Sequence, residues 1–290
     1  MARIELGDTI LFYHDERLSY LRKVQEKGDF ECHKGRIPWN DIVGAEYGNT
    51  VRTHMNFDFA LLKPSFADLM KGIERRTTIA YPKDVAYILL RASISQGTKV
   101  VEVGSGSGAF TFILAKYVQP DGHVYSFERR PEFLELAKRN CDRLKVSGFV
   151  TFKLRDVERE GFDTSDADVC IVDVPEPWNI VPHAATALAP AGRWVSLSPT
   201  TEQLQETRKA LQKYGFVRFE TVEILVREMK IREQGSRPNE RMISHTAYLA
   251  FADKPGNTTV TAVSSQGDES IDNSFSNDKL TKVINKAQEE

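Results

Sequence analysis

The sequence has few cysteines, no long apolar run and almost no net charge. Its three cysteines, Cys32, Cys141 and Cys170, are widely separated and match neither a disulfide framework nor a metal-binding spacing. We therefore expect a cytoplasmic protein without a metal ion. No stretch of about eighteen apolar residues is present to span a membrane, and residues 1–8 lack the apolar run of a signal peptide. The sequence thus predicts neither a membrane protein nor a secreted one.

The net charge of −2 argues against a protein that attracts its partner with a positive field over the whole surface. Basic residues instead gather in local clusters, including the pair Arg75 and Arg76. A longer basic run lies where glycine and proline indicate a loop between two strands, and comprises Arg227, Lys230, Arg232, Arg237 and Arg241. Such clusters suit an RNA backbone, and a solvated face is the alternative interpretation.

What the chain does contain is a glycine-rich turn between an apolar strand and a helix. Residues 98–103 form the expected strand, and the turn holds Gly104, Gly106 and Gly108. Glycines there let the backbone approach a ligand, and the free N–H groups of the next helix bind its anionic end. The following strand ends in Glu128, about twenty residues further on, where a carboxylate binds the two hydroxyls of a ribose. The pattern predicts a ligand with an adenosine-like ribose.

Strand and helix patterns alternate from residue 98 onward. Strands are expected at 98–103, 123–128, 149–154, 167–172 and 193–198, and helices near 109–118, 131–144, 179–188 and 201–214. This alternation predicts an α/β fold, with a parallel sheet covered by helices on both faces. Two further strand patterns, near 216–229 and 243–252, have no helix between them and predict an antiparallel hairpin at one edge. The set favours a seven-stranded Rossmann-like methyltransferase sheet.

The chain divides into three parts by composition. Residues 1–62 show short strand patterns between turns and predict a small β-rich N-terminal domain. Residues 63–253 hold the expected methyltransferase domain. Residues 254–290 are rich in Ser, Asn, Thr, Asp and Gln, and predict a disordered polar tail.

The glycine pattern alone leaves two ligands open. Gly104, Gly106 and Ala109 fit the dinucleotide fingerprint, whereas Glu102 with Gly104, Gly106 and Gly108 fits the S-adenosylmethionine pattern equally well. Ligands of open α/β sheets bind beyond the carboxyl ends of the strands, where four acidic residues fall. They are Glu102, Glu128, Asp156 and Asp173. Asp156 is placed to reach an adenine amino group, with a helix cap as the alternative.

Asp173 opens the segment Asp-Val-Pro-Glu-Pro-Trp that ends at Trp178. A carboxylate at the end of a buried strand, followed by two prolines and an aromatic residue, is typical of a site that holds a flat base. The alternative is a capping Asp before a stiff loop. Such a carboxylate accepts a hydrogen bond from an adenine amino group and stabilises positive charge on the ring.

Seven segments together resemble the tRNA (adenine-N1)-methyltransferase family, over about residues 1–252. They are Tyr81–Asp84, Glu102–Ala109, Ser126–Arg130, Asp173–Trp178, Ser198–Gln203, Arg237–Pro238 and His245–Leu249. Members of this family form 1-methyladenosine at position 58, in the T-loop of tRNA. The chain departs from the usual pattern at Ser105 and Ser244, neither of which removes an expected functional group.

The resemblance implies S-adenosylmethionine as cofactor, tRNA as partner and a homotetramer; whether adenosine 57 is also a target stays open. Asp173 and Tyr81 are the expected catalytic residues. Those expected to bind the cofactor are Glu102, Gly104, Gly106, Ser107, Gly108, Ala109, Phe110, Glu128, Phe133, Asp156 and Asp173. Those expected to contact the substrate are Trp178, Arg237 and His245, although His245 is equally interpreted as a structural histidine.

Three other functions remain as alternatives. A nicotinamide-dependent oxidoreductase would share the glycine turn but leave the Asp173–Trp178 segment without a role. A methyltransferase of a protein or a small molecule would use the same cofactor. A non-catalytic tRNA-binding subunit is disfavoured because the glycine turn is intact.

Overall fold

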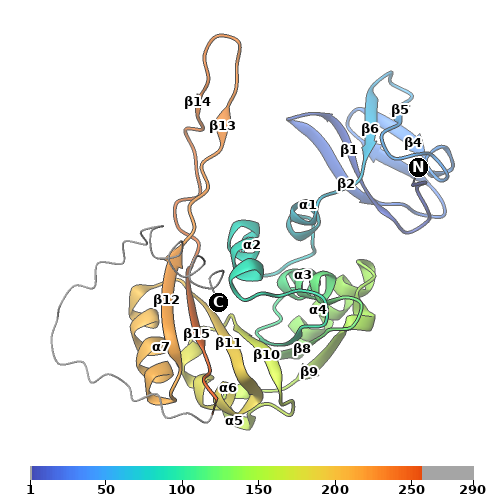
Figure 1. Ribbon diagram of the computed structural model, residues 1–290. Helices are drawn as coiled ribbons and strands as arrows, with labels where there is room; N and C mark the ends of the chain where they lie inside the picture. Colours follow the sequence, from blue (N-terminus) through green and yellow to red (C-terminus); the bar gives the residue numbers. More distant parts are fainter. Residues whose placement is uncertain (1, 257–290) are drawn as a thin grey trace, which may run out of the picture. The chain divides into compact units, whose positions relative to one another are not determined.

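The computed structural model describes residues 2–256 and has an α/β fold built on a seven-stranded sheet (Figure 1). The strand order is β12-β15-β11-β10-β7-β8-β9. In chain order the strands are β7 (Lys99–Val103), β8 (His123–Glu128), β9 (Val150–Leu154), β10 (Ala167–Val172), β11 (Leu188–Ser198), β12 (Val217–Glu223) and β15 (Tyr248–Asp253). Strands β11 to β9 pair in parallel, and β15 is antiparallel to both β11 and β12. The predicted sheet and its antiparallel edge are confirmed.

Helices cover both faces of this sheet because its central strands are apolar on both sides. Along β7, Val100 packs into one core cluster with α3, whereas Val101 and Val103 pack into a second cluster with α6. The helices are α1 (Phe66–Lys71), α2 (Pro82–Arg91), α3 (Ala109–Val118), α4 (Pro131–Arg143), α5 (Val157–Glu160), α6 (Val181–Ala187) and α7 (Thr201–Lys213). Short 3-10 helices are η1 (Trp39–Asp41), η2 (Ser147–Phe149) and η3 (Pro177–Asn179). None of the helices between residues 2 and 256 is long and apolar enough to cross a bilayer.

The N-terminal part is rich in strands and has an aromatic core of its own. Its strands are β1 (Thr9–Asp15), β2 (Leu18–Lys23), β3 (Asp29–Cys32), β4 (Gly35–Pro38), β5 (Thr50–Arg52) and β6 (Asp58–Leu62). Phe12 and Phe30 stack with ring centroids 3.9 Å apart, and Trp39 and Phe59 meet them edge-on. This core contains no residue of the seven-stranded sheet.

The two last predicted strands are shorter than their sequence patterns. β12 ends at Glu223 and β15 begins at Tyr248, while the residues between them form a hairpin arm, defined as 224–247 (Figure 1). Within the arm, β13 (Met229–Lys230) pairs with β14 (Arg237–Pro238). Most arm residues are exposed, although Ile224 and Ala247 at its two ends pack against the core beside the sheet. The predicted tail lies outside the described residues from 257 onward.

Candidate functional site

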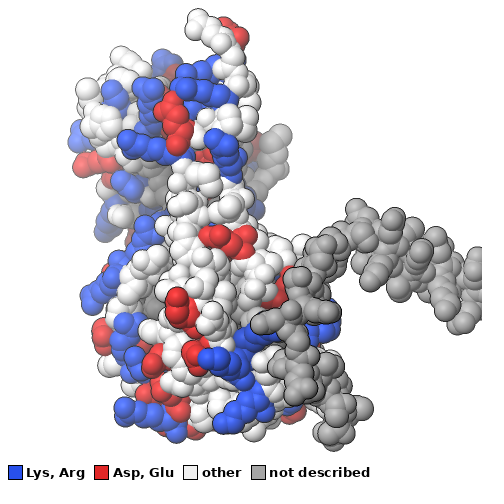
Figure 2. Space-filling view, turned by 90° about the vertical axis from the view of Figure 1, so that its left-hand side faces the viewer, with Lys and Arg blue, Asp and Glu red and all other residues white. Residues whose placement is uncertain are grey.

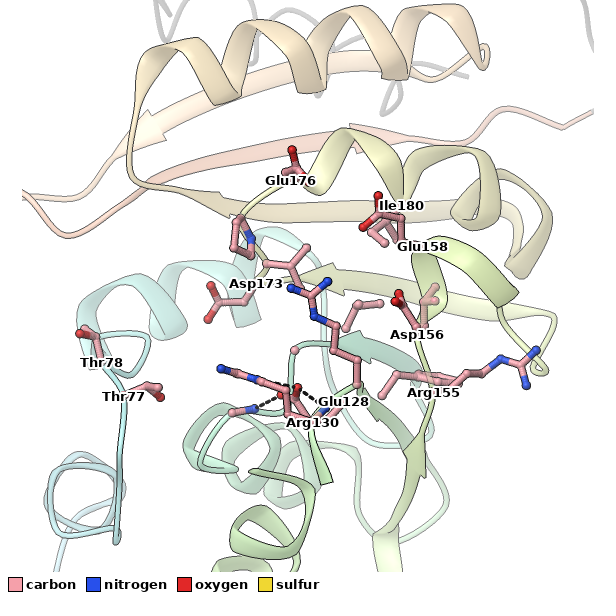
Figure 3. Close-up of a pocket in the computed structure, with 18 residues that line it drawn as sticks. Thr77, Thr78, Glu128, Arg130, Arg155, Asp156, Glu158, Asp173, Glu176 and Ile180 are labelled. Atoms are coloured by element: carbon pink, nitrogen blue, oxygen red, sulfur yellow. Dashed lines mark hydrogen bonds and ion pairs between the residues drawn. The ribbon is translucent and has the colours of Figure 1, made fainter. Parts of the chain in front are cut away.

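A cavity of about 260 Å³ opens at the carboxyl ends of β7, β8 and β10 (Figure 3). Five of the predicted site residues line this cavity together, namely Gly104, Gly106, Glu128, Asp156 and Asp173. Its wall also carries residues that sequence reasoning did not single out as site residues, namely Thr77, Thr78, Arg129, Arg130, Arg155, Glu158 and Glu176. Most of these lie next to a predicted residue or motif, so proximity in sequence was the signal that could have found them.

Two glycines of the turn are required for different reasons. A Cβ on Gly104 would lie 2.3 Å from the carbonyl oxygen of Asp173, so only glycine allows the ends of β7 and β10 to approach. Gly106 has a φ of +53°, and a Cβ there would meet only the Thr77 hydroxyl, at 4.0 Å. The backbone at Gly106 therefore borders open space in the cavity, where a ligand can approach it.

Glu128 is held in a fixed orientation at the end of β8. Its Oε1 accepts hydrogen bonds from the N–H and Nε of Arg130, at 3.0 and 3.2 Å, and its Oε2 accepts one from the N–H of Gly106 at 3.2 Å. The Arg130 guanidinium lies 3.8 Å from the centre of the Phe133 ring. Since a carboxylate offers about four acceptor positions, Glu128 keeps capacity for a further donor such as a hydroxyl.

The start of α3 suits an anionic group. The Ser107 hydroxyl is buried and has no hydrogen-bond partner within residues 2–256. The first N–H groups of α3 have no acceptor inside the helix. A cofactor carboxylate would satisfy both, so the residues present fit S-adenosylmethionine. The side chains from Ser107 to Phe110 are buried beside the cavity rather than exposed on its wall.

Asp173 directly follows β10, and its N–H donates to the carbonyl of Val103 at 3.0 Å. Its side chain is open to the cavity, but protein surrounds it on the other sides, and this burial raises the pKa of Asp173 to about 6. Figure 3 shows the carboxyl group pointing toward Thr77 and Thr78, away from Asp156. Asp173 therefore lies between the end of the cavity that Thr77 and Thr78 line and the end that Asp156 lines.

The turn after Asp173 is fixed from α7. Thr200 and Gln203 form a capping box at the start of that helix, with the Thr200 hydroxyl accepting from the Gln203 N–H. The Gln203 side chain also donates to the carbonyl of Pro175 at 2.7 Å. The segment Ser198–Gln203, which carried part of the family resemblance, thus positions the Asp173–Trp178 segment.

A second cavity, of about 630 Å³, shares Thr77 and Thr78 with the first. Its walls also include the predicted catalytic residue Tyr81, on the loop before α2. Three basic residues, Lys71, Arg75 and Arg76, line the same space. The pair of cavities brings an aromatic ring and basic groups next to the site of Asp173.

Two of the family motifs meet in a buried network that was not predicted. Lys83 Nζ donates to Asp84 Oδ1 at 2.7 Å and to the Thr246 hydroxyl at 2.6 Å. The Thr246 hydroxyl donates to Asp84 Oδ2, also at 2.7 Å, and Asp84 is only 1% exposed. The network joins the helix start after Tyr81 to the end of the hairpin arm. Asp84 and Thr246 both stand in motifs that carry the family resemblance, which was the signal; their contact across 162 residues was not visible in the sequence.

Glu102 lies behind the cavity, not on its wall. It is 1% exposed, and its Oε2 accepts hydrogen bonds from the hydroxyls of Ser126 at 2.5 Å and Thr111 at 2.6 Å. Burial raises the pKa of Glu102 to about 7. In this structure Glu102 braces β7 against β8 and α3, and direct contact with a cofactor stays a prediction.

The three predicted substrate contacts do not line either cavity. Trp178 is half-buried in η3, and Arg237 forms an ion pair with Glu240 at 2.6 Å on the arm. His245 Nδ1 lies 2.7 Å from Glu223 Oε1, and its Nε2 lies 2.8 Å from the carbonyl oxygen of Pro199. The hydrogen bond to Glu223 raises the pKa of His245, and both ring nitrogens face acceptors. Their contact with substrate stays a prediction.

The basic run on the arm is interrupted by acidic residues. Glu228, Glu233 and Glu240 alternate with its five basic residues. The arm also exposes apolar side chains, including Ile231 at 78% and Leu225 at 58%. Its positive field is therefore weaker than the sequence run suggests. Within residues 2–256, no group of three or more His, Cys, Asp or Glu side chains is arranged to hold a metal ion.

Comparisons with known proteins agree with this geometry. The family model described as "tRNA methyltransferase complex GCD14 subunit" matches residues 61–236. The tRNA (adenine(57)-N(1)/adenine(58)-N(1))-methyltransferase TrmI of Methanocaldococcus jannaschii is 36% identical, over 81% of this chain and 90% of its own length.

Two solved structures are similar along most of the chain. A Thermotoga maritima protein described as an S-adenosylmethionine-dependent O-methyltransferase has a TM-score of 0.82 and 35% identity, covering 88% of this chain and 96% of its own. The tRNA (m1A58) methyltransferase TrmI of Aquifex aeolicus has a TM-score of 0.75 and 28% identity, covering 88% of this chain and 100% of its own. With its glycine turn, Glu128 and Asp173 around one cavity, the chain belongs to the tRNA (adenine-N1)-methyltransferase family.

Proposed function

We propose that this protein is an S-adenosylmethionine-dependent methyltransferase that forms 1-methyladenosine at position 58 in the T-loop of tRNA. The observation that carries the proposal is the place of Asp173, on the wall of the cavity with Glu128 and Gly106 and pointing toward the threonines of the second cavity. A carboxylate there faces both a cofactor and a base.

The first cavity binds the cofactor. Glu128 accepts from the ribose hydroxyls, and Asp156 from the adenine amino group. The start of α3, with the unpaired Ser107 hydroxyl, holds the methionine carboxylate. Carboxylates prevail on this wall, which suits a ligand with a cationic sulfonium and an ammonium group. When bound, S-adenosylmethionine supplies a methyl group on that sulfonium.

Asp173 acts on the substrate base. The N1 atom of neutral adenine already has a free lone pair, so the protein needs no strong general base. Methylation places positive charge on the ring, and the Asp173 carboxylate stabilises it by accepting a hydrogen bond from the N6 amino group. With a pKa of about 6, this carboxyl is mostly ionised at neutral pH. Holding the cofactor and the adenine in position for the transfer contributes the rest of the rate acceleration.

The second cavity receives the displaced nucleotide. Because N1 lies on the pairing edge of adenine, the base has to leave its contacts in the tRNA before it reacts. Tyr81 lies on the wall of that cavity and offers the ring on which the base rests. The Lys83–Asp84–Thr246 network fixes the start of α2 directly after Tyr81, and so limits the movement of that ring.

We also propose the division into an N-terminal β domain of residues 1–62 and a methyltransferase domain of residues 63–253. The separate aromatic core of the first part supports it. The exposed apolar side chains of the hairpin arm favour contact with another protein surface, in keeping with a homotetramer. A cytoplasmic location accords with buried or half-buried cysteines that are all free.

A methyltransferase acting on a hydroxyl group is the second candidate, favoured by the description of the Thermotoga maritima structure. Methylation of an alcohol needs a base, because the hydroxyl group must lose its proton. Methylation of adenine N1 instead needs a hydrogen-bond acceptor for the N6 amino group. One experiment separates the two functions. The purified protein is incubated with labelled S-adenosylmethionine and unfractionated tRNA, which is then digested to nucleosides. Label in 1-methyladenosine supports the proposal, and label in another nucleoside or none in tRNA contradicts it.

A further inference from the structure

Three basic side chains of the second cavity have no role in the function described so far. Lys71 ends α1, and Arg75 and Arg76 follow on the loop toward α2. All three line the cavity, and all are exposed. Within residues 2–256 none of them forms a salt bridge to a carboxylate. Three free cations around one concave surface call for an anionic ligand.

The neighbouring acidic residue does not neutralise them. Glu74 is the one acidic residue between Lys71 and Arg76, and its carboxylate lies 3.9 Å from the guanidinium of Arg139 on α4. The cavity therefore keeps its positive charge. The hairpin arm differs from this cavity in its charge, because Arg237 on the arm forms an ion pair with Glu240.

The basic loop is tied to the cofactor site by a buried amide. Asn140 on α4 is 2% exposed, and its Nδ2 donates to the carbonyl of Glu74 at 2.8 Å and to that of Ser107 at 2.9 Å. One side chain thus fixes the loop beside Arg75 to the glycine turn. Thr77, two residues further, borders both cavities. The basic groups consequently stand at a set position relative to Asp173.

We propose that Lys71, Arg75 and Arg76 form a phosphate-binding site for the RNA backbone on either side of the displaced adenosine. This inference rests on the proposed function and adds the contact that holds the nucleotide in place. A nucleotide turned out of its stack carries a phosphate on each side, and guanidinium groups bind phosphate through paired hydrogen bonds. With the phosphates held by the loop, the base extends past Tyr81 toward Asp173.

The test compares two double variants by their tRNA binding. Arg75→Gln with Arg76→Gln removes two cations from the cavity. Lys209→Gln with Lys213→Gln removes two from α7, where Lys209 already pairs with Glu206. Figure 2 shows the face that includes α7, where basic and acidic side chains are mixed. Filter binding at a series of salt concentrations gives the slope of log affinity against log salt, and calorimetry with S-adenosylmethionine verifies that each variant is folded.

We expect the Arg75/Arg76 variant to bind tRNA at least tenfold more weakly and to lose about 1.4 from the salt slope, since each single-stranded phosphate contact contributes about 0.7. Its cofactor affinity should match the wild type, and the α7 variant should keep the wild-type slope. An unchanged slope in the Arg75/Arg76 variant, or an equal loss in the α7 variant, would overturn the proposal. Binding is measured without methyl transfer, so this test does not depend on the proposed activity. If the protein forms no 1-methyladenosine but the Arg75/Arg76 variant still loses tRNA affinity, the proposed function is refuted and the phosphate-binding site still stands.

Discussion

Replacing Asp173 tests whether its carboxylate takes part in the chemical step. Asp173→Ala removes the acceptor for the adenine amino group, and we expect the methylation rate to fall by about 10²–10³, the usual loss for one preorganised electrostatic partner. Asp173→Asn keeps an acceptor oxygen without the charge and should lose less. Binding of tRNA should change little, because phosphate contacts elsewhere supply most of its affinity.

The pH dependence follows from the same carboxyl group. With a pKa of about 6, Asp173 is ionised above that pH and becomes protonated as the pH falls through it. The protonated form no longer accepts from the amino group, so the wild-type rate should drop about tenfold for each unit below pH 6. The Asp173→Ala variant should lack this dependence on Asp173, because the titrating group is gone.

Single-turnover assays at saturating cofactor and tRNA separate the chemical step from binding. Glu176→Gln is the matched control, because it removes a carboxylate from the same turn and the same cavity. We expect it to change the rate far less than Asp173→Ala. A near-wild-type single-turnover rate for Asp173→Ala would refute the proposed role, as would equal losses in the two variants.

Three further predictions concern carboxylates that are buried in the structure. Glu128→Ala should weaken S-adenosylmethionine binding by about 1.5–3 kcal/mol, the contribution of a hydrogen bond to a charged group, and unchanged affinity in calorimetry would remove Glu128 from the site. Asp84→Asn should destabilise the protein by about 3 kcal/mol, because its lysine partner stays half-buried without a carboxylate; denaturation in urea measures the change, and a loss below about 1 kcal/mol would contradict it. Glu102→Gln tests the raised pKa of Glu102. In the wild type the folded state binds the Glu102 proton more tightly than the unfolded chain does, so the contribution of Glu102 to stability is highest below pH 4.5 and declines as the pH rises to about 7. Relative to wild type, the variant should gain stability between pH 5 and pH 8, by about 3 kcal/mol at most, and an equal difference at both pH values would count against this reasoning.

The sheet could be predicted from the sequence because its strands are short apolar runs between clear helix signals. Pro82 and Pro131 stand at the first positions of α2 and α4, where the fixed φ of proline suits a helix start. The hairpin arm was less predictable. Its residues keep β-branched and apolar character while having little to pack against, so the sequence pattern extends beyond β12 and β15.

The candidate site was predictable where function depends on a strand end. Glu128 is the last residue of β8 and Asp173 directly follows β10, and parallel strands end at one edge of a sheet. The contacts that fix these residues were not predictable, since Gln203 and Asn140 act through carbonyl groups far away in the sequence. Because every residue has a backbone carbonyl group, the sequence does not show which of them accepts such a hydrogen bond.

The central claim is tested most directly by the position and chemistry of the methyl group on an unmodified tRNA transcript. The wild-type protein is incubated with S-adenosylmethionine and either a transcript with adenosine at position 58 or one with guanosine there. The methylated base is then located by primer extension and identified by mass spectrometry of nucleosides. The account predicts 1-methyladenosine at position 58 in the first transcript and no methylation at that position in the second. Equal methylation of both transcripts at sites other than 57 and 58, or a methyl group on another atom, would contradict it.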